Sequence, residues 1–209
     1  MVDLKVINID KYIEKNDETK LSTHYLMPQG VFRSILVGSS NGGKSNLLID
    51  MLTRNKVCYN ALYVYSKHID QEAWENNLDN LVGVNELDCN DDAIIVIDDF
   101  NTNVSKKQKE NIADLFCSAR HKSTSIFYLG QLYHEIPRPC RLNLSYLFLF
   151  DNNNRRELSL LTTELASDKT PEEFRKIYKY ALKDKYNFLM IDNTNNELRY
   201  RKNFDEILK

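Results

Sequence analysis

Residues 38–45 combine small residues, a lysine and hydroxyl groups in a pattern suited to binding phosphate. They read Gly-Ser-Ser-Asn-Gly-Gly-Lys-Ser and match the pattern G-x-x-x-x-G-K-[ST] without substitution. Glycines lack Cβ, so consecutive backbone N–H groups can converge on the oxygens of a triphosphate. Lys44 would reach the β- and γ-phosphates, and the Ser45 hydroxyl would complete the shell of Mg²⁺. The predicted nucleotide-binding residues are Gly38, Ser39, Ser40, Asn41, Gly42, Gly43, Lys44, Ser45 and Asn46.

Two neighbouring carboxylates, Asp98 and Asp99, follow an unbroken aliphatic run at residues 93–97. Such a run is typical of a parallel strand buried on both faces, and ligands of open α/β sheets bind where these strands end. Asp98 would hold Mg²⁺, directly or through water, and Asp99 is placed to polarise the attacking water. The alternative is that both residues merely cap a turn, but their pairing with the phosphate-binding pattern favours a Walker-B-type element.

Gln131 follows another predicted buried strand, residues 125–130. A polar amide at the carboxyl edge of a sheet can sense a γ-phosphate or orient water. It can equally be an ordinary strand terminator, and its position alone leaves both interpretations open.

The elements that must position these residues alternate between strands and helices. The apolar residues of 31–37 predict a strand leading into the glycine-rich turn, and the helical spacing of 46–52 predicts the helix that the motif requires. Further strands are predicted at 61–66 and 144–150, helices at 71–77, 104–120, 155–165 and 171–182, a brief extended segment at 81–84, and a hairpin formed by 186–192 and 197–201. We therefore predict an α/β fold with a mostly parallel central sheet flanked by helices and a C-terminal β-hairpin.

The chain is expected to hold one domain. Residues 1–30 would form an N-terminal arm or partner contact, with Val6, Ile7 and Ile9 forming an edge strand. Residues 31–209 would form a single P-loop domain, with its core motifs in 31–150 and the C-terminal helices and hairpin in 151–209.

The composition excludes several classes of protein. With 209 residues and a net charge of −2, the chain has no global basic field, although a local patch or a ring of subunits could still bind nucleic acid. The four cysteines form no C-x-x-C pair, so reduced thiols in an intracellular protein are expected. The sequence shows neither a signal peptide nor an apolar run approaching ~20 residues, so we expect a soluble protein that is not secreted and has no membrane partner.

Several motifs together resemble one family. After the phosphate-binding pattern and the Asp98-Asp99 strand, the chain carries Ala-Arg-His-Lys at 119–122, Gly-Gln at 130–131, Ile-Pro at 136–137 and Arg-Leu-Asn at 141–143. This order resembles the DNA-packaging ATPases of large double-stranded DNA viruses, virophages and Polinton-like elements, which are the poxvirus-type ATPases of the FtsK/HerA superfamily. The resemblance covers roughly residues 31–150.

The resemblance implies a fold, a reaction and partners. The fold would be RecA-like and of the ASCE type, with an extra strand between the P-loop strand and the Walker B strand. ATP and Mg²⁺ would be the nucleotide and the metal, and Gln131 would be the sensor-like residue. Asp99 occupies a position where relatives often have glutamate. Family members form homo-oligomeric rings, pentamers or hexamers, that move double-stranded DNA into a preformed capsid. The expected partners are therefore DNA, further copies of the chain and a capsid vertex or capsid proteins, in the host cytoplasm, the viral factory or the virion.

A ring would also need an arginine that acts on the neighbouring subunit's nucleotide. Arg120 is the first candidate and Arg141 the alternative. Arg120 could instead stabilise the C-terminus of its helix through the dipole, and Arg141 could hold the proline-containing loop. The candidates for DNA contact, which would be made to phosphates, are Lys106, Lys107, Lys109, Arg199, Arg201 and Lys202.

Three rival functions remain open at this point. A nucleoside or nucleotide kinase would also bind a triphosphate, with Arg155-Arg156 as a remnant of a lid. Another DNA-translocating or remodelling ATPase would share the motifs. A capsid or scaffold module with vestigial hydrolysis would be expected to lose Lys44, Ser45 or Asp98, and all three are intact.

Overall fold

The structure, a computed structural model, describes residues 6–8, 28, 30–53, 57, 59, 61–66, 93–100, 105–152, 154–166, 168–197 and 199–209. The predicted helix at 71–77 and the extended segment at 81–84 lie outside these residues. Most of the predicted N-terminal arm lies outside them too, so the division of the chain at residue 30 stays a prediction.

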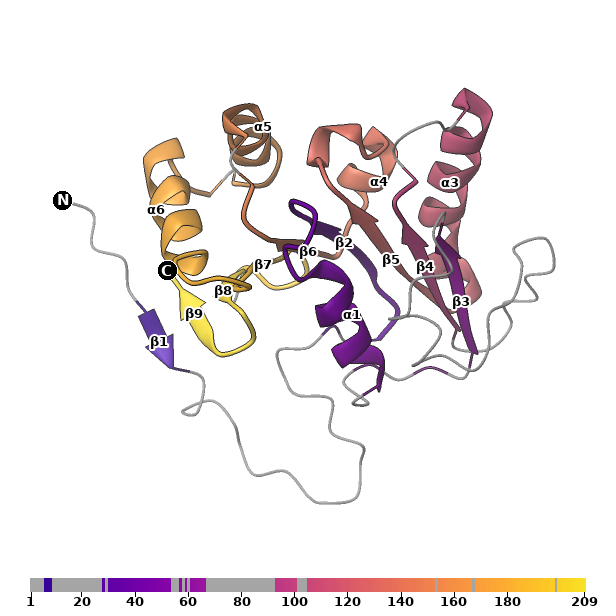
Figure 1. Cartoon of the computed structure of the whole chain (residues 1–209), viewed down its shortest axis with the longest axis horizontal. Helices are drawn as coiled ribbons and strands as arrows, with labels where there is room; N and C mark the ends of the chain where they lie inside the picture. The colour runs from indigo at the N-terminus through magenta and orange to yellow at the C-terminus, as the bar shows by residue number, and fades with distance from the viewer. Residues whose placement is uncertain are drawn as a thin grey trace, which may run out of the picture.

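One sheet of nine strands runs through the described residues (Figure 1). Its spatial order is β1-β9-β8-β7-β6-β2-β5-β4-β3. The strands are β1 (Val6–Asn8), β2 (Arg33–Val37), β3 (Ala61–Ser66), β4 (Ala93–Asp98), β5 (Thr124–Gly130), β6 (Tyr146–Leu149), β7 (Leu189–Asp192), β8 (Tyr200–Lys202) and β9 (Glu206–Leu208). The first and last of these in the sequence pair with each other, and β1 lies at the edge of the sheet.

The five strands from β3 to β6 in this order are parallel to one another. Strand β5 lies between β2, which leads into the phosphate-binding turn, and β4, which ends in Asp98. The expected parallel sheet with an inserted strand is therefore confirmed. Parallel strands have their carboxyl ends at one edge, so β2, β4 and β5 deliver the residues that follow them to the same place.

The remaining strands are antiparallel and extend the sheet beyond β6. The predicted hairpin is confirmed as β7 and β8, whose pairing runs from Leu189 opposite Lys202 to Ile191 opposite Tyr200. Strand β9 pairs with β8 on the far side of the hairpin, so β8 is an interior strand.

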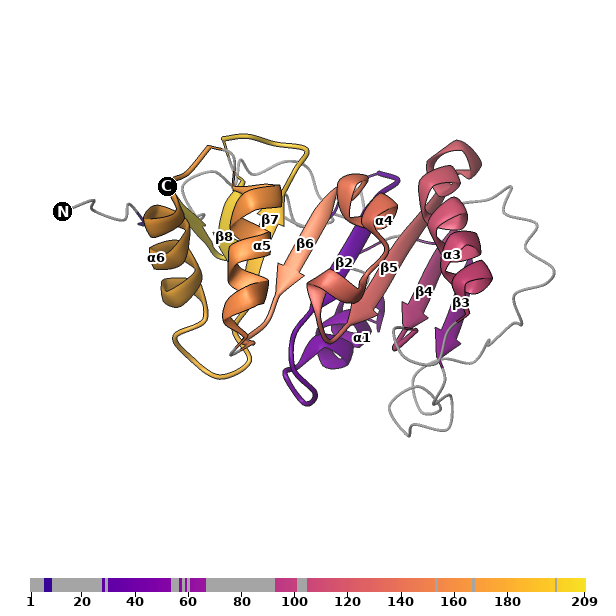
Figure 2. The ribbon, with the colours of Figure 1, turned by 90° about the horizontal axis from the view of Figure 1, so that it is seen from above.

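Helices cover both faces of the sheet (Figures 1 and 2). The helix α1 (Lys44–Thr53) packs on one face, and α3 (Lys106–Ser118), α4 (Arg138–Leu142), α5 (Arg155–Leu165) and α6 (Pro171–Ala181) pack on the other. Two 3-10 helices, η3 (Ala119–Lys122) and η4 (Tyr133–Glu135), flank β5 in the sequence.

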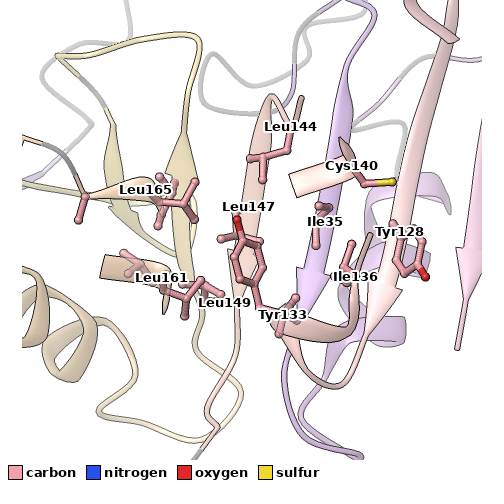
Figure 3. Close-up of a cluster of buried hydrophobic side chains, with 14 of the residues drawn as sticks. Ile35, Tyr128, Tyr133, Ile136, Cys140, Leu144, Leu147, Leu149, Leu161 and Leu165 are labelled. Atoms are coloured by element: carbon pink, nitrogen blue, oxygen red, sulfur yellow. The ribbon is translucent and has the colours of Figure 1, made fainter. Parts of the chain in front are cut away.

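Successive strand residues feed separate cores because side chains alternate between the two faces. In β2, Ile35 and Val37 belong to the core under α3–α6, whereas Leu36 belongs to the core under α1. Figure 3 shows part of the larger core, where Tyr133 lies near Leu147 and Leu149 and Ile136 lies near Ile35. Burial of Tyr133 anchors the segment that follows Gln131.

The ends of the helices carry recognisable start signals. Ser105 and Gln108 form a reciprocal capping box at α3, and Thr170 and Glu173 form another at α6. Pro139 lies in the first turn of α4, where the missing N–H removes no helical hydrogen bond. Among the residues that the structure describes, no helix is long and apolar enough to cross a membrane.

Candidate nucleotide-binding site

The phosphate loop, residues 38–43, is held between the two strands that flank β2. The amide of Gly38 donates to the carbonyl of Gly130 at 3.3 Å, at the end of β5. The amide and the hydroxyl of Ser39 both donate to the carbonyl of Asp151, at 3.3 and 3.1 Å, just beyond β6. These bonds fix the start of the loop at the carboxyl edge of the sheet.

Two glycines of the loop occupy positions that a larger residue could not easily take. A Cβ on Gly38 would lie 2.5 Å from the Cβ of Phe150, closer than real Cβ contacts allow. Gly43 has φ of 101°, a conformation that L residues rarely adopt. The sequence predicted glycines here for access to phosphate, and the structure adds packing against Phe150 as a second reason.

Lys44, the first residue of α1, folds back over the loop. Its Nζ donates to the carbonyls of Gly38 at 2.8 Å and Ser39 at 2.9 Å. Burial lowers the pKa of Lys44, and the nearby carboxylates of Asp98 and Asp99 act in the opposite direction. The ammonium is therefore positioned between the phosphate loop and the two acids.

A cavity of about 190 Å³ joins the predicted catalytic residues. Its lining includes Lys44, Ser45, Asp98, Asp99 and Gln131, with Ser40 and Asn41 from the loop and Ser66 from the end of β3. The structure thus brings Lys44, Ser45, Asp98, Asp99 and Gln131 to one cavity. Of the other predicted nucleotide-binding residues, Ser40 and Asn41 line it, whereas Gly38, Ser39, Gly42, Gly43 and Asn46 do not. The chemical roles of the lining residues stay predictions.

The oxygen donors of this cavity fit the predicted Mg²⁺. Ser45 contributes a hydroxyl and Asp98 a carboxylate, and Mg²⁺ prefers hard oxygen ligands and is commonly held by one or two carboxylates with substrate phosphates. Asp99 has φ of 56°, a left-handed conformation that aspartate tolerates better than most residues. The chain thus turns sharply as it leaves β4, and both carboxylates line the cavity.

The backbone at Gln131 is held by residues that the sequence analysis missed. The side-chain amide of Asn152 donates to the carbonyl of Gln131 at 3.2 Å, and the amide of Asn152 donates to the Tyr178 hydroxyl at 3.3 Å. The side chain of Gln131 remains exposed at the mouth of the cavity. Asn152 had no recognisable signal, because only the fold brings the segment after β6 into contact with the segment after β5, across the end of β2.

Glu157 is the second residue that was missed. It is 3% exposed and accepts hydrogen bonds from the amide of Tyr133 and from Nδ1 of His134, the latter at 2.5 Å. Its position four and eight residues before the buried Leu161 and Leu165 places it on the apolar face of α5. A charge on a buried helical face was the available signal, and here it fixes the segment after Gln131.

Comparison with protein families then identifies the chain. A model of the family described as Poxvirus A32 protein matches residues 18–201. The chain belongs to this family. The membership confirms the resemblance to poxvirus-type ATPases, and the match extends beyond the roughly 31–150 that carried it. Comparison with curated proteins gave no significant match.

Solved structures share the fold of this A32-family chain. The genome packaging NTPase B204 of Sulfolobus turreted icosahedral virus 2, in complex with AMP, is 15% identical with a TM-score of 0.62, covering 84% of this chain and 99% of B204. The DNA-packaging ATPase B204 of Sulfolobus turreted icosahedral virus is 14% identical with a TM-score of 0.59, covering 82% and 97%. EssC (ATPases 2 and 3) of Geobacillus thermodenitrificans is 10% identical with a TM-score of 0.56, covering 83% and 39%. These likenesses show that the chain shares its P-loop ATPase fold with the B204 packaging proteins and with the EssC ATPases.

The two candidate arginines of this A32-family chain differ in their surroundings. Arg120 is exposed in η3, just before β5 begins. The seven residues of β5 separate it from the cavity by about 20 Å at roughly 3.3 Å per residue, so its guanidinium does not reach the cavity of its own chain. Arg141 is 10% exposed and binds Glu164 at 2.5 Å and the carbonyl of Ile136 at 3.1 Å. The internal partners of Arg141 favour Arg120 as the finger.

The predicted DNA contacts also divide into two groups. On the hairpin, Arg201 is buried in an ion pair with Asp192, and Arg199 donates to the carbonyl of Leu165 at 2.6 Å. Lys202 is 15% exposed and lies near Asp184 and Glu206. The internal partners of Arg199, Arg201 and Lys202 disfavour these three residues as DNA contacts. At the start of α3, Lys106 and Lys107 are exposed and Lys109 is partly exposed, so these three remain candidates.

Proposed function

We propose that this chain is an ATP-hydrolysing motor that translocates double-stranded viral DNA into a preformed capsid. One observation carries the proposal: a single cavity holds Lys44 and Ser45 of the phosphate loop, the paired acids at the end of β4, and Gln131. This set supplies a phosphate cradle, hard oxygen ligands and groups that can activate water, which together suit hydrolysis of a triphosphate.

The residues divide the chemistry among them. The loop amides and the Lys44 ammonium hold the β- and γ-phosphates and offset charge as the γ-phosphoryl group leaves. Asp99 polarises a water for in-line attack on phosphorus, and Gln131 orients that water. Ser45 and Asp98 would hold Mg²⁺, which when bound supplies further positive charge beside the phosphate oxygens.

The names of the relatives support both the nucleotide and the task. The B204 protein of the archaeal virus is a genome packaging NTPase and has been solved with ATP-γS, so ATP is the proposed substrate here. Membership of the Poxvirus A32 protein family supports assignment to viral genome packaging. The proposed site of action is the viral factory in the host cytoplasm or the assembling virion.

The proposal includes a ring of five or six copies and contact with the capsid. Arg120 lies far from its own cavity and is exposed, which supports a role on the neighbouring subunit's nucleotide. The lysines at the start of α3 would contact DNA phosphates, because a packaging motor must bind any sequence.

The test is hydrolysis by purified protein with and without duplex DNA. We expect phosphate release that rises with duplex DNA and needs no phosphate acceptor, and a loss of about a hundredfold or more in Lys44→Ala and Asp98→Ala. Phosphate transfer to an added nucleoside or nucleotide, with no effect of DNA, would favour the kinase alternative. An undiminished rate in Lys44→Ala would contradict any role for the phosphate loop.

A further inference from the structure

A second cavity adjoins the phosphate loop on the side away from Asp98 and Asp99. It measures about 370 Å³ and is lined by Ser39, Asn41 and Gly42 of the loop, by Asp151, and by the turn at 182–187. Asn41 lines both cavities. Because β2 lies between β5 and β6, the cavity with the acids opens on the β5 side of the loop, and this one opens on the side of β6 and β7.

The volumes of the two cavities suggest how one nucleotide could occupy both of them. Small-molecule sites usually measure about 300–1,000 Å³, so the first cavity is small for a complete nucleotide and the second falls within the range. A nucleotide whose γ-phosphate faces the acids must lead its ribose and base past the loop. The second cavity lies where the ribose and base would then extend, on the β6 side of the phosphate loop.

The turn at 182–187 presents an aromatic ring to this cavity. Tyr186 is 58% exposed, one of the few large hydrophobic side chains in the described part of the chain that are exposed. Its Cδ1 lies 3.4 Å from where a Cβ of Gly43 would be, so the ring stands directly against the phosphate loop. The ammonium of Lys185 lies 4.7 Å from the ring centroid, and the exposed remainder of the ring is free to stack on a planar group.

Neighbouring residues hold the backbone of Tyr186 in an unusual conformation, and this fixes the position of the ring. Tyr186 has φ of 69°, which is unusual for a bulky residue, and such conformations persist only where neighbours impose them. The neighbours here are Asn187 and Asn203. The side-chain Nδ2 of Asn203 donates to Oδ1 of Asn187 at 3.0 Å, and the side-chain Oδ1 of Asn203 accepts from the backbone amide of Phe188 at 3.0 Å. Phe188 in turn packs against Phe150, with ring centroids 5.6 Å apart.

We propose that the second cavity binds the base and ribose of the nucleoside triphosphate, with the base stacked on Tyr186. This inference rests on the proposed function, since it assigns the nucleoside part of the same ligand. Stacking does not distinguish one base from another, so ATP and GTP should both gain from the ring. The carboxylate of Asp151, which also lines the cavity, offers acceptors for ribose hydroxyls.

The experiment compares binding of Mg²⁺-ATP, Mg²⁺-GTP and inorganic tripolyphosphate by the full chain. The variant Tyr186→Gly removes the ring while glycine adopts the observed backbone without strain, so loss of folding does not confuse the result. Tyr186→Phe keeps the ring and is the matched control. We expect Tyr186→Gly to weaken ATP and GTP about tenfold and to leave tripolyphosphate unchanged, with Tyr186→Phe within about twofold of wild type.

Three results would overturn the inference while leaving the phosphate site intact. They are unchanged ATP affinity in Tyr186→Gly, equal weakening of ATP and tripolyphosphate in that variant, and wild-type protein that binds tripolyphosphate as tightly as ATP. Failure of the proposed function looks different. In that case Lys44→Ala would bind tripolyphosphate as well as wild type, or the wild-type protein would bind neither ligand.

Discussion

At the scale of single residues, the site depends on contacts that are too close to tolerate added atoms. Gly38 is the clearest case, because its missing Cβ is what allows Phe150 to pack against the start of the phosphate loop. The sequence motif predicts a glycine at this position. It does not reveal the partner, which lies more than a hundred residues away in the chain.

Gly38→Ala should therefore disrupt nucleotide binding. The new Cβ would lie 2.5 Å from that of Phe150, so either the loop or the strand end must shift away from the phosphate-binding position. We expect at least a tenfold loss of ATP affinity, measured by titration calorimetry. Gly30→Ala is the control: nothing lies within 4 Å of that Cβ, so the strain of its φ of 60° should lower stability without lowering affinity. Full affinity in Gly38→Ala would show that the loop adapts.

Replacing Arg141 should lower stability, whereas replacing Arg120 should slow hydrolysis. Arg141→Ala leaves the half-buried carboxylate of Glu164 without its ion-pair partner, which should cost about 3 kcal/mol of unfolding free energy. Arg120→Ala removes an exposed side chain and should change stability by less than about 0.5 kcal/mol while slowing hydrolysis about a thousandfold. Urea unfolding and phosphate release measure the two effects. A stable Arg141→Ala protein with slow hydrolysis would identify Arg141, and not Arg120, as the arginine finger.

At the scale of elements, α6 begins with a capping box and leads into the turn that carries Tyr186. Thr170 accepts from the amide of Glu173, and the Glu173 carboxylate accepts from the amide and hydroxyl of Thr170, both at 2.8 Å. Thr170→Ala should lower the unfolding free energy by about 1 kcal/mol, measured by urea unfolding at neutral pH. No change would mean that packing of the helix on the sheet alone fixes its start.

The same box predicts a pH dependence. The hydrogen bonds from Thr170 lower the pKa of Glu173 below its ordinary value of 4.5 in the folded protein. A lowered folded pKa means that the contribution is present above pH 4.5 and is lost as the pH falls through the folded value. Glu173→Gln should therefore be less stable than wild type near pH 7, with the difference shrinking in acid. Glu172→Gln removes a charge from the same turn without these bonds, and its difference should be smaller. Equal behaviour of the two variants would contradict the box.

Sequence patterns predicted the elements well where they are determined locally. The strand before the phosphate loop, the helix after it and the strand ending in Asp98 follow from periodicity and motif, and α5 has the predicted bounds. Arg199 and Lys202 looked available for DNA contact because their partners, the Leu165 carbonyl and the carboxylates of Asp184 and Glu206, lie outside the predicted hairpin. Asn152 and Tyr186 act across distant segments, so no local pattern could assign them, whereas Glu157 had a local signal in its spacing from Leu161 and Leu165.

At the scale of the whole molecule, the order of the strands explains why distant motifs form one site. Insertion of β5 between β2 and β4 places Gly130 and Gln131 between the phosphate loop and the acids. The same order leaves η3 and Arg120 at the opposite edge of the sheet. Arg120 of η3 therefore does not reach the nucleotide of its own chain. The Arg120 of a neighbouring copy could act on that nucleotide instead.

Mixing two inactive variants tests this arrangement. Arg120→Ala keeps its own cavity but offers no arginine, whereas Asp99→Ala offers the arginine but has a defective cavity. If the finger acts between subunits, a mixture should recover part of the duplex-dependent hydrolysis that neither variant shows alone. Phosphate release across mixing ratios, with the mass in solution recorded alongside, gives the result. No recovery in mixed oligomers would place the effect of Arg120 within its own subunit.

The central claim is that the phosphate loop and the acids at the end of β4 act on one triphosphate. A crystal structure with a non-hydrolysable ATP analogue and Mg²⁺ tests it most directly. We expect γ-phosphate density within hydrogen-bond distance of Lys44 Nζ and a metal ion between the Ser45 hydroxyl and the Asp98 carboxylate. A triphosphate bound away from Lys44, or a metal that Asp98 does not approach directly or through water, would contradict it.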